Sequence, residues 1–278
     1  MSKGLVNKII PFSVVDGPGN RMAIFFQGCN FDCLYCHNPE TIKRCAQCGT
    51  CLFSCKFDAI SMVGDSVIWQ EEKCKDCGEC IKVCKNSCGP KTKAMSVGEI
   101  LQEVIKVKPF ISGITVSGGE CTLQNKFLVD LFEKVKKLDL TVFVDTNGST
   151  DFSKNKELVD LMDMAMLDIK SFDRDEHIKL TGRDNDMVLK NAEYLAGINK
   201  LYEVRTVIVP GVLDNFDNVN EISKLIASLN PEIRYKIIKY RPIGVRTDKI
   251  EAVQPNDEMM EELKVIASKN GCKNIIIV

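Results

Sequence analysis

Residues 29–36 read Cys-Asn-Phe-Asp-Cys-Leu-Tyr-Cys and bring Cys29, Cys33 and Cys36 into one short loop. The loop follows an apolar run, Met22–Phe26, that predicts a strand. A [4Fe–4S] cluster normally takes four cysteine ligands, whereas this local set stops at three. The spacing therefore predicts a cluster with one iron open to a substrate or cofactor. The residues alone also fit a zinc site or unrelated buried thiols.

The bulk composition limits the partners and the compartment. The 278 residues carry 37 basic and 38 acidic side chains, so no polyelectrolyte partner such as nucleic acid is indicated. Met1–Lys8 is too polar for a signal peptide, and no apolar run reaches the ~18 residues that a membrane span needs. We therefore expect a cytoplasmic chain without a membrane partner, whose 14 cysteines bind metal rather than form disulfides.

A second group of cysteines forms an internal repeat. The pattern C-x2-C-x2-C-x3-C begins at Cys45 and again 29 residues later at Cys74. Between the copies, Ala59–Met62 and Ser66–Trp69 read as a short hairpin. A zinc ribbon would need only four cysteines, so two identical quartets favour iron–sulfur clusters. Cys88 lies outside both quartets and is interpreted as a spare thiol.

The double run resembles that of bacterial two-cluster ferredoxins, in which the fourth cysteine of each run binds the other cluster. The resemblance implies two ligand sets, one of Cys45, Cys48, Cys51 and Cys84 and the other of Cys74, Cys77, Cys80 and Cys55. The usual proline after the fourth cysteine is replaced by Lys56 in one copy and Lys85 in the other. A positive charge there would raise the potential of a nearby cluster.

From Ser96 onward the sequence alternates between helical stretches and apolar runs. Ser96 and Glu99 predict a capping box for a helix that ends near Val107. Further helices are predicted over Gln124–Leu138 and near Asp257–Asn270. The predicted strands are Met22–Phe26, Ile111–Ser117, Leu140–Asp145, Met164–Ile169, Glu203–Val209 and Ile233–Tyr240, with Asn274–Val278 as a closing strand. This alternation predicts a parallel sheet, as a partial barrel or a doubly wound sheet.

Polar residues gather where the predicted strands end, which is where chemistry collects in parallel α/β folds. Gly118-Gly119 permits a close backbone approach, and the carboxylate of Glu120 can accept from an ammonium group. Asp145 and Asp168 end neighbouring strands and repel each other unless a cation lies between them. Lys170 suits an anionic cofactor group. Capping of the following helices is the alternative for either aspartate.

Two motifs carry a resemblance to a known family. The three cysteines, with the aromatic Tyr35 before the last, resemble the CxxxCxΦC motif of radical S-adenosylmethionine (SAM) enzymes. Ser13, Val15–Gly19 and Arg21 resemble the S-x-VDGPG-x-R stretch of glycyl-radical-enzyme activases, and the likeness runs from about Ile9 to Gly244. The resemblance implies a partial open (β/α)6 barrel over residues 1–40 and 92–278, with a ferredoxin-like α+β insert over residues 41–91.

The resemblance also implies site residues. SAM would bind the open iron, with its amino group at the glycine pair and its carboxylate beside the lysine. A monovalent cation, Na+ or K+, would lie next to that carboxylate. The residues implied to bind SAM or the cation are Tyr35, Gly118, Gly119, Glu120, Asp145, Thr146, Met166, Asp168, Lys170, Arg205 and Arg241. Arg241 stands where the activases commonly have a histidine, and Cys121 replaces their frequent proline.

The implied function is activation of a glycyl radical enzyme. An activase cleaves SAM reductively and uses the 5′-deoxyadenosyl radical to abstract hydrogen from a backbone glycine of its partner. The insert and the stretch Ile114–Gln124 look most like the YjjW-type activases, whose partner is a YjjI-type glycyl radical protein. We expect a monomer with three [4Fe–4S] clusters, reduced by a flavodoxin or ferredoxin. The insert would relay electrons or shape partner recognition. The alternatives are a radical SAM enzyme acting on a small molecule, RNA or peptide, and an electron carrier.

Overall fold

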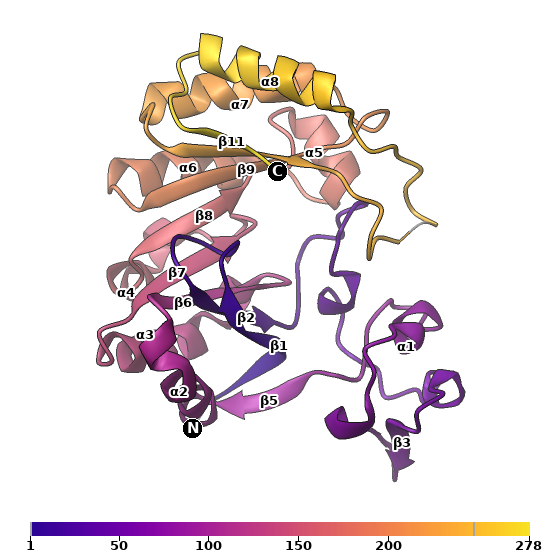
Figure 1. Cartoon of the computed structure of the whole chain (residues 1–278). Helices are drawn as coiled ribbons and strands as arrows, with labels where there is room; N and C mark the ends of the chain where they lie inside the picture. The colour runs from indigo at the N-terminus through magenta and orange to yellow at the C-terminus, as the bar shows by residue number, and fades with distance from the viewer. Residues whose placement is uncertain (1, 247) are drawn as a thin grey trace.

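The computed structural model describes residues 2–246 and 248–278, and within them the largest unit is a nine-stranded mixed sheet (Figure 1). In sheet order the strands are β11 (Ile275–Ile277), β10 (Arg234–Lys239), β9 (Leu201–Ile208), β8 (Met164–Asp168), β7 (Thr141–Thr146), β6 (Gly113–Gly118), β2 (Arg21–Phe26), β1 (Lys3–Ser13) and β5 (Lys93–Ser96). The predicted strands are confirmed as β2, β6–β10 and the closing strand β11, all paired in parallel.

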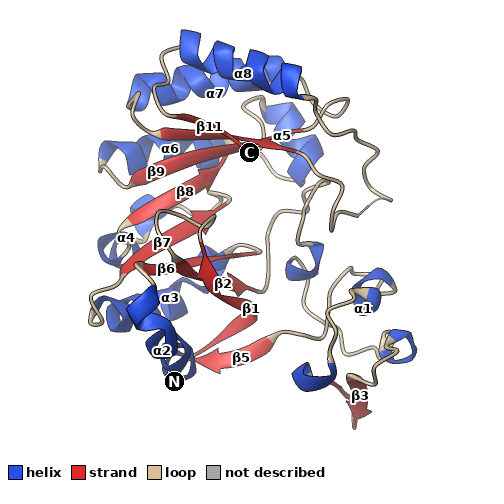
Figure 2. Cartoon of the chain, viewed as in Figure 1, coloured by secondary structure: helices blue, strands red, loops and turns tan. Residues whose placement is uncertain are grey.

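The main helices follow the outside of the curved sheet, as Figure 2 shows. They are α2 (Val97–Val107), α3 (Asn125–Lys136), α4 (Lys156–Leu161), α5 (Arg174–Thr181), α6 (Asp186–Gly197), α7 (Asn215–Leu229) and α8 (Asp257–Lys269). The predicted capping box is present, because Glu99 N–H donates to Ser96 Oγ over 3.3 Å and Ser96 N–H to Glu99 Oε2 over 2.7 Å. Across the described ranges, no helix has the length and apolar character to span a bilayer.

The sheet is open, because β11 and β5 occupy the two ends of its strand order. Side chains in the middle of the parallel sheet are buried, as Ile114 and Val116 of β6 illustrate at 0% exposure, whereas β10 and β11 at its edge are only partly buried. Together with apolar residues of the helices they form one continuous core. The fold is thus the partial open barrel, and helices do not cover both faces as a doubly wound sheet requires.

Two strands were not predicted from the sequence. Strand β1 pairs antiparallel with β2, and β5 pairs antiparallel with β1. Strand β1 mixes polar residues with apolar ones and is exposed at several positions, and the four residues of β5 are exposed or half-buried. They form because the apolar strand β2 offers a partner, since strand formation depends on cross-strand packing more than on intrinsic preference.

Residues 41–91 lie apart from the barrel helices and contain little regular structure (Figure 1). The predicted hairpin is confirmed as β3 (Ile60–Val63) and β4 (Ser66–Trp69), paired antiparallel. The one α-helix described in this segment is the four-residue α1 (Glu79–Lys82). The barrel and insert boundaries remain a prediction.

Candidate active site

The three cysteines of the Cys29–Cys36 loop border a cavity of about 200 Å³ at the carboxyl ends of β2, β6, β7 and β8. Most of the predicted SAM and cation residues line the same cavity, namely Tyr35, Gly118, Gly119, Asp145, Thr146, Asp168 and Lys170. Other predicted residues lie outside the described lining, namely Glu120, Met166, Arg205 and Arg241. The parallel strands thus gather side chains from four separate motifs around one space.

The glycine pair after β6 is required by close backbone packing. Gly118 has a positive φ of 118°, and a Cβ added there would lie 2.3 Å from the backbone of Phe26. A Cβ on Gly119 would lie 2.3 Å from the carbonyl oxygen of Gly28. Gly119 N–H donates to Phe26 O over 2.9 Å, which fastens the end of β6 to the start of the cysteine loop. Any larger residue would push the two segments apart.

The cysteine side chains suit a metal cluster in their donor chemistry. Burial raises the pKa of both Cys29 and Cys33 to about 12, so these thiols stay protonated at neutral pH unless iron competes for the sulfur. Asn147 Nδ2 lies 3.7 Å from Cys29 Sγ and can donate to a sulfur ligand there. The Tyr35 hydroxyl is buried and has no hydrogen-bond partner among the described residues.

Glu120 is buried and bonded to protein groups on both carboxylate oxygens. Oε1 accepts from the hydroxyls of Thr122 and Thr146, over 2.5 and 3.0 Å, and Oε2 accepts from Asn147 N–H over 2.7 Å. These bonds tie the end of β6 to the end of β7. Glu120 therefore positions the loop that carries Thr146 and Asn147, and its contact with a SAM amino group remains a prediction.

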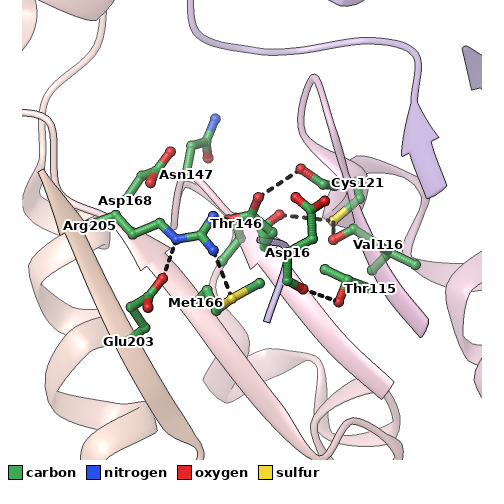
Figure 3. A network of polar contacts seen from close by, with 12 residues as sticks. Asp16, Thr115, Val116, Cys121, Thr146, Asn147, Met166, Asp168, Glu203 and Arg205 are labelled. Atoms are coloured by element: carbon green, nitrogen blue, oxygen red, sulfur yellow. Dashed lines mark hydrogen bonds and ion pairs between the residues drawn. The ribbon is translucent and has the colours of Figure 1, made fainter. Parts of the chain in front are cut away.

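Arg205 pairs with two carboxylates, and Figure 3 shows its guanidinium beside Glu203 and Met166. Its Nη1 donates to Asp145 Oδ1 over 3.0 Å, and its Nε donates to Glu203 Oε1 over 2.5 Å. Its Nη2 lies 2.9 Å from Met166 Sδ. Burial raises the pKa of Asp145 and outweighs the opposing effect of the guanidinium. The Arg205 guanidinium is thus a cationic partner of Asp145, and this pairing was not predicted from the sequence.

Asp168 is likewise matched by a side-chain cation. Lys170 Nζ donates to Asp168 Oδ2 over 2.6 Å and lies 5.9 Å from the centre of the Tyr35 ring. Burial acts to lower the pKa of Lys170, but Asp168, Tyr35 and Cys33 together outweigh burial and raise the pKa well above its usual value. Since each aspartate has its own basic partner, repulsion between them does not by itself require a metal cation.

Two residues near the cysteines, His37 and Arg246, were not predicted from the sequence. His37 lines the cavity and packs edge-on against Tyr240, with ring centres 6.2 Å apart. Arg246 donates to the Cys33 carbonyl over 2.8 Å and to Asp32 Oδ1 over 2.5 Å. His37 is marked by its place directly after the motif, whereas nothing local in the sequence marks Arg246. Arg241 is exposed.

The Val15–Gly19 stretch lies at the opposite, amino end of β2. Arg21, which is 1% exposed, donates to Thr115 Oγ1 over 2.8 Å and to Ile114 O over 2.6 Å. Its guanidinium stacks on Phe143 at 4.2 Å from the ring centre. Asp16 accepts from Thr115 through its backbone carbonyl and points into the barrel interior (Figure 3). The arginine of this motif therefore fixes the loop in place.

The eight cysteines of the insert fall around two separate cavities. One is lined by Cys45, Cys48, Cys51 and Cys84, together with Cys88, and the other by Cys55, Cys74, Cys77 and Cys80. In the part of the chain that the structure describes, no three Cys, His, Asp or Glu side chains converge closely enough to hold a single metal ion. Ligation of clusters remains a prediction.

A three-cysteine loop facing a glycine pair at the carboxyl edge of an open parallel barrel defines a radical SAM site. A family model described as the radical SAM superfamily matches residues 23–226. The pyruvate formate-lyase-activating enzyme of Staphylococcus epidermidis is 30% identical over 98% of this chain and 98% of its own length. A protein of Haemophilus influenzae named as a glycyl-radical enzyme activating enzyme is 29% identical over 98% of this chain and 96% of its own length. The chain belongs to the radical SAM superfamily and, within it, to the glycyl-radical-enzyme activating enzymes.

Solved structures agree with this fold. The match to a domain of pyruvate-formate lyase-activating enzyme from Bacteroides vulgatus covers 60% of this chain and 99% of that domain, with a TM-score of 0.53 at 22% identity. QueE from Escherichia coli covers 99% of this chain and 94% of its own, with a TM-score of 0.54 at 10% identity. The superfamily implies a SAM-binding [4Fe–4S] cluster, and the activase family implies a glycyl radical enzyme as partner. The YjjW-type subgroup remains a prediction.

Proposed function

We propose that this activase holds a [4Fe–4S] cluster through Cys29, Cys33 and Cys36 and abstracts hydrogen from a backbone glycine of its partner. When bound, the cluster would supply one electron to SAM. SAM would then be cleaved to methionine and a 5′-deoxyadenosyl radical, which accepts the hydrogen. The observation that carries the proposal is the single cavity shared by the three cysteines, the glycine pair and Lys170.

The chain's own residues bind and orient the cofactor in this proposal. The glycine pair admits the SAM amino group next to the cysteine loop, with Glu120 holding the loops around it. Lys170 attracts the SAM carboxylate, because its ammonium borders the cavity and is only 14% exposed. A Na+ or K+ ion beside that carboxylate would take oxygens of Asp145, Thr146, Asp168 and the Met166 backbone. We assign Tyr35, Arg205 and Arg241 to the part of the site that faces the nucleoside of SAM.

We also propose that the insert holds two further [4Fe–4S] clusters, for three in the chain. Their ligands are the crossed sets that the two cavities support, Cys45, Cys48, Cys51 and Cys84, and Cys74, Cys77, Cys80 and Cys55. Held there, they would supply a path for electrons from a flavodoxin or ferredoxin to the SAM cluster of a cytoplasmic monomer. The partner is a YjjI-type glycyl radical protein. The names of the relatives add pyruvate formate-lyase as a second candidate partner.

Electron paramagnetic resonance under anaerobic conditions tests the function. Reconstituted, reduced protein is mixed with SAM and either a YjjI-type protein or pyruvate formate-lyase. We expect a glycyl doublet on one partner, in step with 5′-deoxyadenosine, and neither product with Cys33→Ala. SAM cleavage without a protein radical on any glycyl radical enzyme of the host would overturn the partner assignment and point to a small molecule or peptide as substrate.

A further inference from the structure

Cys88 is one of three cysteines outside the predicted ligand sets, together with Cys121 and Cys272. Its side chain is 3% exposed, and its Sγ lies 3.5 Å from Cys84 Sγ. It lines the same cavity as the Cys45 quartet. A turn closed by Ser87 N–H donating to Cys84 O, over 2.8 Å, returns the chain so that the two sulfurs meet. Five thiols therefore surround a space that needs four ligands.

The internal repeat supplies a built-in comparison for this fifth thiol. The two copies share backbone conformation: Ser87 has a φ of 50° and Asp58, 29 residues earlier, a φ of 52°. Gln47 and Asp76, also 29 residues apart, have φ values of 58° and 53°. The position equivalent to Cys88 is consequently Ala59, which is 1% exposed and lines the other cavity. The first copy of the repeat, which begins at Cys45, thus has a methyl group at Ala59 where the second copy has the thiol of Cys88.

We infer that the Cys45 cavity has two interchangeable fourth ligands, Cys84 and Cys88, whereas the Cys74 cavity has only Cys55. The inference rests on the proposed clusters. In the exchange, the Cys88 thiol gives up its proton as its sulfur bonds to iron, and the Cys84 thiolate leaves iron and takes up a proton. No electron is transferred and the charge is unchanged. The reserve thiol retains the fourth iron when its first ligand is lost.

Iron and sulfide content, with electron paramagnetic resonance and Mössbauer spectra of the reconstituted full chain, test the inference. Wild-type protein should hold about 12 irons, four for each cluster. We expect Cys84→Ala to keep this content with an altered spectrum. The double variant Cys84→Ala/Cys88→Ala should lose about one iron and show a three-iron cluster. Cys55→Ala should lose iron in the same way, and Cys55→Ala/Ala59→Cys should recover it.

Equal iron loss in Cys84→Ala and in the double variant would overturn the inference. Wild-type protein that reconstitutes with only about 4 irons would instead overturn the proposed insert clusters, which is a distinct result. If Cys84→Ala does not fold by circular dichroism, a limited oxidant challenge of Cys88→Ala decides. We expect this variant to lose about one iron more than wild type, and equal loss would rule out a reserve ligand.

Discussion

The barrel buries a continuous apolar cluster from its strands and helices, whereas the buried cluster described within the insert has four members, Cys51, Ile60, Val67 and Cys80. Two of these four are predicted cluster ligands. A core this small does not offset the conformational entropy of the segment, and small domains of this kind usually rely on metals or disulfides. If the proposed clusters are present, the two regions depend on different sources of stability, apolar burial in the barrel and metal–sulfur bonds in the insert.

Iron removal should produce the largest difference between the barrel and the insert. A chelator applied under anaerobic, reducing conditions removes the iron on which, in our proposal, folding of the insert depends. We expect backbone amides of residues 41–91 to lose nearly all protection, while β6–β9 keep theirs. Hydrogen exchange read by mass spectrometry measures both regions in one sample. Full protection of the insert in iron-free protein would show that its small apolar core is enough to keep it folded without iron.

A cavity in the barrel core should have the next largest effect. Leu131 in α3 is 0% exposed, and Leu131→Ala should lower the free energy of unfolding by about 3–5 kcal/mol. Iron content should stay unchanged, because the lost packing lies in the barrel. The matched variant is Val67→Ala in the insert, where we expect an unchanged main transition and faster iron loss. Denaturant unfolding measures the stability of each variant, and iron analysis measures its iron loss. Iron loss in Leu131→Ala with a destabilised main transition in Val67→Ala would contradict the division between the two regions.

What the sequence predicts follows the same division. The parallel strands were predicted because their residues are apolar and buried on both faces, as in β6 and β7. Strands β1 and β5, which are partly exposed, were missed because their pairing depends on tertiary context. In the insert, sulfur spacing predicts which cysteines share a cavity, and the hairpin was the only strand pair to predict among the described residues there.

The candidate site divides in a similar way. Residues within the strand-end motifs, such as Asp168 and Lys170, line the predicted cavity. Arg205 was predicted at the site but not in its ion pair with Glu203, which depends on side-chain packing below the strand ends. Arg246 was beyond prediction, since the Cys33 carbonyl that it binds lies 213 residues away in the chain. Long-range contacts of this kind leave no local pattern.

Electron delivery should separate the two regions by function. Cys77→Ala removes a proposed insert ligand without touching the barrel cavity. With flavodoxin or ferredoxin as reductant, we expect the rate of SAM cleavage to fall by at least about tenfold. With dithionite, a small reductant, the rate should stay within about twofold of wild type. Cys272→Ala, which removes a buried thiol from the barrel core, is the control.

Equal rates for Cys77→Ala and wild type with both reductants would remove the relay from our proposal. If the glycyl radical yield alone then fell, the insert would instead serve partner recognition. Partner binding measured by sedimentation separates these two roles.

The smallest effect should come from a contact confined to the barrel cluster. Arg246, with a side chain 10% exposed, places a positive charge on the Cys33 carbonyl and Asp32. Because reduction adds negative charge to the cluster, Arg246→Gln should lower its midpoint potential by about 30–60 mV. Lys249 bonds to Asp32 alone among the described contacts and is more exposed, so Lys249→Gln should shift the potential less. Redox titration followed by electron paramagnetic resonance resolves the clusters, and the insert potentials should not move. A shift of equal size in the insert clusters would mean that Arg246 acts through the overall fold, and would remove this distinction between the two regions.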